Sequence, residues 1–265
     1  MADPNCISDV SVVSISQATT ATFTDLYFQR TFLFFIQVGS KKVLCPINGE
    51  LVGNTGDVIV FPAGSIVTLE NRPVFNANYR ATGICFPEEI IRQVFPDQRS
   101  KRGALGVQVV PSHFNLTSKI LNPLRVTLQN QDLPESIRVH RLLESLIWLK
   151  HYGVQLSAYE EESPLSKVRR LVETDLSHPW RSSEVAEHFA MSESTLRRWL
   201  AKSGQGFAKL LQNTRLERGL HFLHSTDIPI SEIALNCGFK TPSHFSDSFR
   251  KRFGIKPSEI RKIED

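Results

Sequence analysis

The sequence has few cysteines and no long apolar run. Its 265 residues contain four cysteines, Cys6, Cys45, Cys85 and Cys237, with neither a CxxC pair nor metal-ligand spacing. The most apolar stretch, residues 32–36, is far too short to cross a bilayer, and the chain does not begin with a basic region followed by a sustained apolar run. These absences argue against a disulfide-rich secreted domain and a transmembrane helix. They predict a protein of the reducing cytoplasm that does not associate with membranes.

A strong excess of charge of one sign is also missing. The net charge is +4, with 41% hydrophobic and 22% charged residues, which is ordinary for a globular protein long enough to form two domains. From residue 164 onward there are 17 Lys and Arg against 12 Asp and Glu, whereas the preceding 163 residues have 14 against 15. The positive charge therefore belongs to the C-terminal part, where contact with phosphate would require it.

The first hundred residues are rich in β-branched and aromatic residues. Runs with strand character, separated by glycine-containing turns, cover residues 10–15, 22–28, 30–38, 41–45 and 57–61. Short strands with frequent turns predict a small antiparallel barrel or sandwich. The run Gly-Asp-Val-Ile-Val-Phe-Pro-Ala-Gly at residues 56–64 resembles the strand and turn of cupin-like barrels.

Histidine is scarce in this part of the chain. Up to residue 163 it occurs only at His113, His140 and His151, and the last two lie in a segment expected to be helical. Ser65 and Ile66 stand where a metal-binding cupin often has a histidine. We therefore expect no metal, no other cofactor and no enzymatic activity, although a barrel of this size can hold one small molecule.

Two apolar stripes at helical spacing follow the strands, one from Leu116 to Leu128 and one from Ile137 to Leu149. They predict two helices that close the N-terminal domain. A polar and acidic segment ending in proline comes next, as expected of a domain boundary. We therefore expect an N-terminal domain, a linker and a helical C-terminal domain, over residues 1–156, 157–164 and 165–265 respectively.

The stretch from Ile230 to Arg261 has the pattern of a helix-turn-helix. Gly238 follows where a first helix has to stop, and Thr241 can cap a second helix with Pro242 in its first turn. The second helix has two phenylalanines one turn apart, a polar opposite face and a basic end. Such a helix is suited to lie in a DNA groove.

A similar unit precedes it in the chain. Residues 182–189 have the pattern of a short helix, Ser192 can cap the next one, and residues 194–200 form its candidate reading helix. A long helix over residues 206–224 connects the two units. Two reading helices joined in this way can enter successive major grooves on one face of DNA, about 34 Å apart.

The C-terminal part resembles AraC/XylS-type transcription regulators. The matching positions of their signature are Ile233, Ala234, Gly238, Phe239, Phe245, Phe249, Gly254, Pro257 and Arg261. Residues 191–198 resemble the family's Met-Ser-x-x-x-Leu-x-Arg element, and Arg215-Leu216 match its connecting helix. The resemblance covers the helical domain strongly and the N-terminal domain loosely. It implies an α+β chain, with an antiparallel cupin-like β-barrel carrying helices and a C-terminal all-α domain with two helix-turn-helix units.

The resemblance also implies a sequence-specific DNA-binding regulator, more often an activator. Arg197 and Arg198 are the best base readers because a guanidinium binds guanine O6 and N7 bidentately, and motif position adds Ser194. The groove-facing residues of the second unit are Ser243, His244 and Ser246. Asp247 stands where the family often has Arg, which leaves base reading by the second unit open. The expected phosphate contacts are Lys202, Thr241, Arg250, Lys251 and Arg252.

A ligand in the barrel is a further implication of the resemblance. Some virulence regulators of this family hold a fatty-acid carboxylate between a barrel cation and a cation near the DNA-binding domain. The candidates in this chain are Arg30, Lys41, Lys42 and His224. Alternatively, the barrel cations are solvated charges that protect sheet edges, and the barrel is an interaction module controlled by a protein partner without any ligand.

Partners follow from the same resemblance. Helices such as residues 115–130 and 135–152 often form a homodimer interface in this family, although the same stripes could only cover the barrel. The expected partners are therefore double-stranded promoter DNA, RNA polymerase, a second copy of the chain, and a fatty acid or other small carboxylate.

Overall fold

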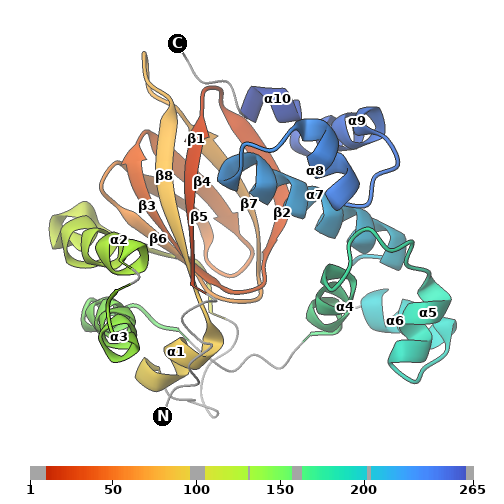
Figure 1. The fold of residues 1–265 in the computed structure, drawn as a ribbon, viewed down its shortest axis with the longest axis horizontal. Coiled ribbons are helices and arrows are strands. Elements are labelled where there is room, and N and C mark those ends of the chain that lie inside the picture. The colour runs from red at the N-terminus through yellow and green to blue at the C-terminus, as the bar shows by residue number, and fades with distance from the viewer. Residues whose placement is uncertain (1–9, 96–104, 131, 157–162, 202–203, 261–265) are drawn as a thin grey trace. The chain divides into compact units, whose positions relative to one another are not determined.

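The chain divides into two units, the first formed mainly by residues 1–160 and the second by residues 161–262. The computed structural model describes residues 10–95, 105–130, 132–156, 163–201 and 204–260 (Figure 1). The expected linker, residues 157–164, lies outside the described residues except for its last two positions, and Cys6 also lies outside them. None of the described helices is both long and apolar enough to span a bilayer.

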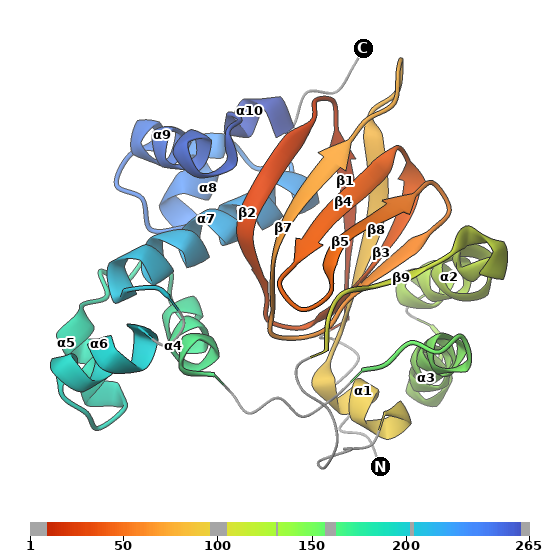
Figure 2. The same cartoon turned by 180° about the vertical axis from the view of Figure 1, so that it is seen from behind.

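The first unit contains two antiparallel sheets that face each other (Figures 1 and 2). One has the strand order β1-β8-β3-β6-β9 and the other the order β2-β7-β4-β5. The strands are β1 (Ser11–Gln17), β2 (Ala21–Phe28), β3 (Thr31–Val38), β4 (Ser40–Cys45), β5 (Gly49–Asn54), β6 (Val58–Phe61), β7 (Ser65–Arg72), β8 (Tyr79–Phe86) and β9 (Gln108–Val110). The predicted fold class is confirmed, because antiparallel sheets are followed by a helical part.

The inner face of each sheet is set by the alternation of side chains along its strands. In β4, Lys41, Val43 and Cys45 are buried, whereas Lys42 and Leu44 between them are more accessible. The register pairs Lys41 with Asn71 and Val43 with Leu69 of β7, so that these residues share one face. Lys41 therefore belongs to the interior between the sheets.

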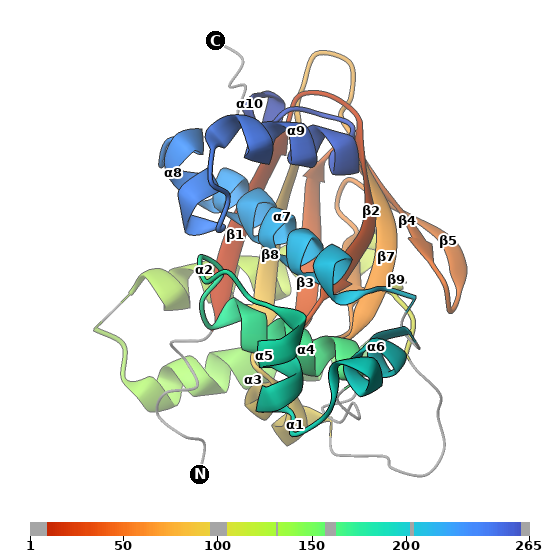
Figure 3. The same ribbon diagram turned by 90° about the vertical axis from the view of Figure 1, so that its right-hand side faces the viewer.

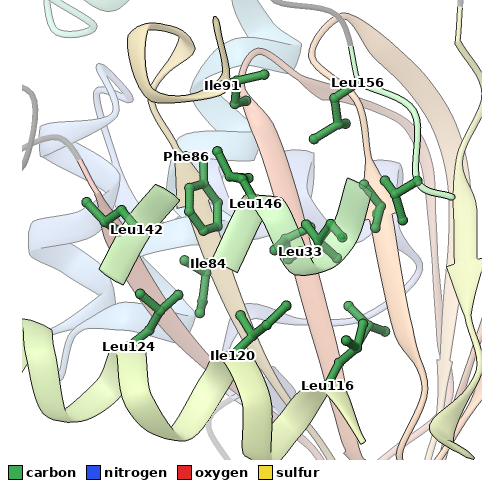
Figure 4. Close-up of a cluster of buried hydrophobic side chains, with 14 of the residues drawn as sticks. Leu33, Ile84, Phe86, Ile91, Leu116, Ile120, Leu124, Leu142, Leu146 and Leu156 are labelled. Carbon is green, nitrogen blue, oxygen red and sulfur yellow. The ribbon is translucent and has the colours of Figure 1, made fainter. Parts of the chain in front are cut away.

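A second core lies on the outer face of the five-stranded sheet. Three helices cover this face: α1 (Glu88–Val94), α2 (Asn122–Gln129) and α3 (Glu135–His151). A turn of π-helix, Thr117–Leu121, leads directly into α2, so the two predicted helical stripes are present. The packed side chains labelled in Figure 4 include Leu33, Ile84 and Phe86 of the sheet and Ile120, Leu124 and Leu146 of the helices. Burial on both faces explains why β3 is apolar almost throughout.

The second unit is helical throughout its described residues (Figure 3). Its elements are α4 (Pro164–Glu173), α5 (Ser182–His188), α6 (Glu193–Ala201), α7 (Phe207–Ser225), α8 (Ile230–Asn236), α9 (Pro242–Phe253) and α10 (Pro257–Ile260). Helix α7 runs from the group α4 to α6 toward the group α8 to α10. It is thus the connecting helix that the sequence predicted.

Local capping explains where these helices begin and end. The Ser192 hydroxyl accepts a hydrogen bond from the Thr195 amide at 3.2 Å, and the Thr241 hydroxyl accepts one from the His244 amide at 3.2 Å. Gly254, with φ of 75°, ends α9 in the left-handed region that glycine adopts without strain. The predicted caps of the two reading helices are therefore confirmed.

Candidate nucleic-acid interface

Helices α5 and α6 form the first helix-turn-helix. Leu196 and Leu200 of α6 are buried, and the turn is closed by a hydrogen bond from the Met191 amide to the Ala186 carbonyl at 2.9 Å. Because residues three and four apart share a helix face, burying these leucines exposes the opposite face. The exposed residues there are Ser194, Arg197 and Arg198, the three positions predicted to reach base edges.

The two arginines of α6 differ in their surroundings. The guanidinium of Arg198 donates to the Thr195 hydroxyl at 3.4 Å, a long and weak hydrogen bond. Arg197 makes no ion pair with a described residue and is exposed. Neither guanidinium is therefore held by a carboxylate of the described chain, which leaves both fork-shaped donors open to a partner.

Helices α8 and α9 form the second helix-turn-helix, whose turn requires glycine. A Cβ atom on Gly238 would lie 2.1 Å from the Leu176 carbonyl oxygen and 2.8 Å from the Arg215 guanidinium. The buried face of α9 presents Phe245, Phe249 and Phe253 in consecutive ring contacts. On its other side, Ser243, His244 and Asp247 are exposed and Ser246 is half-buried.

The predicted phosphate contacts fall into different environments. Arg250 and Lys251 are exposed at the basic end of α9. Thr241 is exposed, although its hydroxyl already caps α9. Lys202 lies outside the described residues, as does Arg261 of the signature. Lys240 is a further exposed cation, in the turn directly before α9, where a basic residue in the sequence is a signal for phosphate contact.

The side chain of Arg252 is turned inward, which differs from its predicted role as a phosphate contact. Its side chain is 9% exposed and its guanidinium pairs with the Glu217 carboxylate of α7. It also donates to the Asn213 carbonyl at 2.6 Å. Because these acceptors hold the guanidinium against α7, Arg252 is not oriented as a phosphate contact.

Of the four predicted ligand residues, only Lys41 lies between the two sheets. Its Nζ donates to the Asn71 side-chain oxygen at 2.5 Å and lies 4.9 Å and 5.2 Å from the ring centroids of Phe34 and Tyr79. No carboxylate of a described residue pairs with it. Burial away from water lowers the pKa of the Lys41 amine from 10.5 to about 7.

The other predicted ligand residues lie in environments that differ from that of Lys41. Lys42 points away from the interior and pairs with Glu50 at 2.8 Å on the surface. Arg30 is exposed at the turn between β2 and β3. His224 belongs to the second unit, where it lies half-buried near the end of α7. Lys41, Lys42 and Arg30, the three candidates in the first unit, therefore do not share one environment.

Further polar groups surround Lys41 that the sequence analysis did not single out. The Asn71 amide donates to the Gln17 side-chain oxygen at 2.9 Å, which links the two sheets. The Tyr79 hydroxyl is buried without a hydrogen-bond partner among the described residues, and burial raises the pKa of this phenol. Polar residues at inward positions of strands are the signal that would have found this group.

A metal centre has no counterpart among the described residues. No group of three or more His, Cys, Asp or Glu side chains in the described part of the chain could hold a metal ion. Cys45, Cys85 and Cys237 are buried and form no disulfide with one another. Burial raises the pKa of the Cys237 thiol to about 12, so this residue is an unreactive core side chain.

Comparison with known proteins identifies the helical unit. Residues 185–263 match a protein family described as a helix-turn-helix domain. The transcriptional activator RhaS from Escherichia coli O1:K1 is 27% identical to this chain over 164 residues, and RhaS from Salmonella heidelberg is 28% identical over 164 residues. The match covers 58% of this chain and spans 59% of the length of these relatives. They are transcription regulators and not enzymes, in agreement with the expectation for this chain.

Solved structures resemble the whole described fold. ToxT from Vibrio cholerae O395 superposes with a TM-score of 0.68 over 97% of this chain and 100% of its own, at 16% identity. Wild-type ToxT from Vibrio cholerae strain SCE256 with a bound unsaturated fatty acid gives a TM-score of 0.66 over 94% and 93% of the two chains, at 17% identity. At this identity the likeness concerns the fold alone. The helix-turn-helix match, the RhaS relatives and the likeness in fold agree with the resemblance of the C-terminal part to AraC/XylS-type transcription regulators.

Proposed function

We propose that the protein binds promoter DNA in a sequence-specific manner and activates transcription in the cytoplasm. The observation that carries this proposal is the pair of exposed polar faces on α6 and α9, joined by the single helix α7. Each reading helix would enter the major groove, and the two grooves would be successive ones on one face of the duplex. Similarity to RhaS supports the choice of an activator, and contact with RNA polymerase follows from that choice.

Within this proposal, α6 supplies most of the base recognition. Arg197 and Arg198 have fork-shaped donors that suit guanine and that no carboxylate of the described chain holds, and Ser194 lies on the same exposed face. In α9, Ser243, His244 and Ser246 would face the groove. Asp247 can accept a hydrogen bond from a base amino group such as that of cytosine, or pair with Arg250, but it cannot bind phosphate because a carboxylate has no donor and is repelled. The second helix-turn-helix would therefore read fewer bases than the first helix-turn-helix.

Phosphate contacts would position the domain on the duplex without specifying sequence. Arg250 and Lys251, at the exposed end of α9, and Thr241 at its start keep this role, and Lys202 remains a candidate. Lys240 joins them as an exposed cation beside the α9 cap. Each of these contacts would add to the salt dependence of binding because it releases a counterion.

The N-terminal unit would respond to a small carboxylate such as a fatty acid, with Lys41 as the cation that receives it. Lys41 is a buried amine with no carboxylate partner among the described residues, and its charge is therefore poorly compensated. The ring of Phe34 lies beside it and continues into contacts with Phe61 at 5.4 Å, which forms an apolar wall suited to an acyl chain. Two ToxT structures contain carboxylic acids, an unsaturated fatty acid and a naphthalenyl-butenoic acid.

Arg30, Lys42 and His224 have a smaller part in this proposal. Arg30 is exposed and Lys42 already pairs with Glu50, so either side chain would have to rearrange to share a ligand with Lys41. His224 lies on α7 in the other unit. A homodimer through α2 and α3 is supported by exposed apolar side chains on their outer surface. These are Val126, Ile137 and Ile147, with 64%, 44% and 56% of their areas exposed.

Two measurements test the proposal. Selection of duplexes from a random-sequence library should yield one enriched motif, and protein that enriches no motif would rule out sequence-specific binding. Organic extraction of the purified protein followed by mass spectrometry should release a carboxylic acid from wild type and much less from Lys41→Ala. Should neither an extracted nor an added carboxylate bind, control by a protein partner would replace the ligand in the proposal.

A further inference from the structure

One carboxylate joins three helices of the DNA-binding unit. Glu217, in the middle of α7, accepts hydrogen bonds from both terminal nitrogens of Arg169 on α4, one of them at 3.3 Å. The same carboxylate pairs with Arg252 on α9. All three side chains are largely withdrawn from solvent, with 2%, 13% and 9% of Arg169, Glu217 and Arg252 exposed. The helix before the first reading unit and the second reading helix are therefore held by a single acceptor.

The neighbouring contacts strengthen the link between α7 and α9. Arg252 donates to the Asn213 carbonyl at 2.6 Å, one turn before Glu217. Gly219 allows the closest approach, because a Cβ atom there would lie 2.6 Å from the Phe245 ring. Helix α9 is thus fixed to α7 both by the packing of Phe245 in its first turn and by the Arg252 pair in its last turn.

A second connection joins α7 and the second helix-turn-helix to the segment that leads into the first. Arg215 of α7 donates to the carbonyl oxygens of Leu176 and His178, at 3.0 Å and 2.8 Å, in the segment between α4 and α5. The Gly238 turn of the second unit packs against the same Leu176 carbonyl. Rotation of one helix-turn-helix relative to the other would therefore break contacts both at Glu217 and at Leu176.

We infer that Glu217 is a positioning residue that fixes the separation and rotation of the two reading helices, so that the domain accepts paired half-sites at one spacing only. The inference rests on the proposed DNA-binding function and adds a geometric restriction to it. A buried ion pair contributes little net stability compared with apolar residues of the same volume, but its directional hydrogen bonds specify one arrangement. A guanidinium fork on each side of one carboxylate provides that direction.

The consequence for binding is one of effective concentration. When two linked modules are held in the geometry that DNA presents, the second binds with a high effective concentration, and looser linkage lowers it. Adding one base pair between half-sites moves the second by about 3.4 Å and rotates it by about 35°, because a turn contains 10–10.5 base pairs. A fixed pair of helices cannot follow that change, whereas an uncoupled pair partly can.

The test uses the full chain and the duplex that wild type selects from a random-sequence library. Affinity is measured for that duplex and for versions with one base pair added or removed between the half-sites. We expect wild type to lose about tenfold with the altered spacing, and Glu217→Gln to lose less than about threefold. Glu217→Gln should also bind the original duplex about 3–10-fold more weakly, since its second helix-turn-helix is less well positioned.

Further variants separate positioning from folding. Arg252→Gln removes the α9 side of the link and leaves Glu217 paired with Arg169, so it should relax the spacing preference in a protein whose melting and circular dichroism remain cooperative and helical. Glu232→Gln removes an exposed carboxylate of α8 from the same unit and should keep the wild-type spacing penalty. If Glu217→Gln and Arg252→Gln both keep that penalty, or if wild type tolerates either spacing, the inference is wrong. If wild type selects no motif at all, the proposed function itself fails.

Discussion

The Nζ of Lys41 donates to the side-chain oxygen of Asn71 at 2.5 Å between the two sheets, and no described carboxylate accompanies this pair. An amide dipole and two aromatic rings are the main groups that stabilise a charge there. They compensate a buried ammonium less well than water does, and this explains why its pKa falls to about 7. Lys41 is thus close to the point where its charge changes at neutral pH.

The first prediction concerns stability and pH. The Lys41 pKa is about 7 in the folded protein and 10.5 when unfolded, so between these values the unfolded chain binds more protons and the free energy of unfolding rises with pH. Below pH 7 the buried charge costs stability in full, and above pH 10.5 it costs none. Lys41→Met should therefore stabilise the protein at neutral pH by a few kcal/mol, about 1.4 kcal/mol for each unit of pKa shift.

Chemical denaturation of wild type, Lys41→Met and Lys42→Met at pH 7 and at pH 9.5 measures this effect. Lys42 is the matched control because it follows Lys41 in β4 but points outward to Glu50. The stability difference between Lys41→Met and wild type should shrink as the pH rises. A difference that is the same at both pH values would mean that Lys41 does not titrate in this range.

The second prediction concerns the ligand. A long-chain fatty acid should weaken DNA binding by about 1–3 kcal/mol, because it favours one state of the regulator over another. Its carboxylate requires a protonated Lys41, so its affinity should fall by up to about tenfold for each pH unit above 7. Titration of the acid against labelled DNA at pH 7, 8 and 9 measures both effects.

Three alanine variants assign the cation in that experiment. Lys41→Ala should abolish the response to the fatty acid, whereas Lys42→Ala and Arg30→Ala should keep it, since these side chains are at the surface. A full response in Lys41→Ala would remove this lysine from the site. Absence of any response in wild type would instead remove the fatty acid from the proposed function.

The features that sequence alone could predict depend on contacts between near neighbours. The hydroxyls of Ser192 and Thr241 each accept a hydrogen bond from an amide three residues ahead. Gly238 likewise marks a turn by itself, because a side chain at that position would clash. The helix-turn-helix units and their exposed arginines were accordingly assigned correctly to helices and turns. The predicted strands corresponding to β1, β2, β3, β4 and β6 had the same local basis.

The features that were missed depend on distant residues. Arg252 was predicted to face DNA, but its partner Glu217 is 35 positions earlier in the chain. That Lys41 faces inward and Lys42 outward is decided by the register of β4 with β7, which one strand cannot reveal. Strand β5 includes Gly49 and Gly53, two residues that the sequence alone assigns to turns. In the fold, the missing side chain of Gly53 leaves space for Ile59 and Ile36.

The third prediction concerns base recognition by α6. Arg197→Ala and Arg198→Ala should each cost about 1–3 kcal/mol at the selected site and relax the preference for particular bases there. A gel-shift series on the selected duplex and on single-base variants of it measures affinity and preference together. Mutants that retain full affinity and selectivity would show that α6 is not the reading helix.

The fourth prediction contrasts two neighbouring cations of α9. Lys251 is exposed, so Lys251→Ala should weaken binding to all sequences alike and lower the slope of log affinity against log salt by about one. Arg252 is held by Glu217 and Asn213, so Arg252→Gln should leave that slope unchanged. It should instead lower the free energy of unfolding by about 1–3 kcal/mol, the cost of losing hydrogen bonds to a charged group.

Salt titrations of DNA affinity between low and moderate ionic strength, together with urea denaturation, distinguish the two residues. Because the substitutions affect adjacent positions of one helix and each removes one positive charge, general charge effects are the same in both. The slope then reports only whether the cation releases a counterion from phosphate. A lower slope in Arg252→Gln with unchanged stability would mean that Arg252 leaves Glu217 and contacts the DNA backbone in the complex.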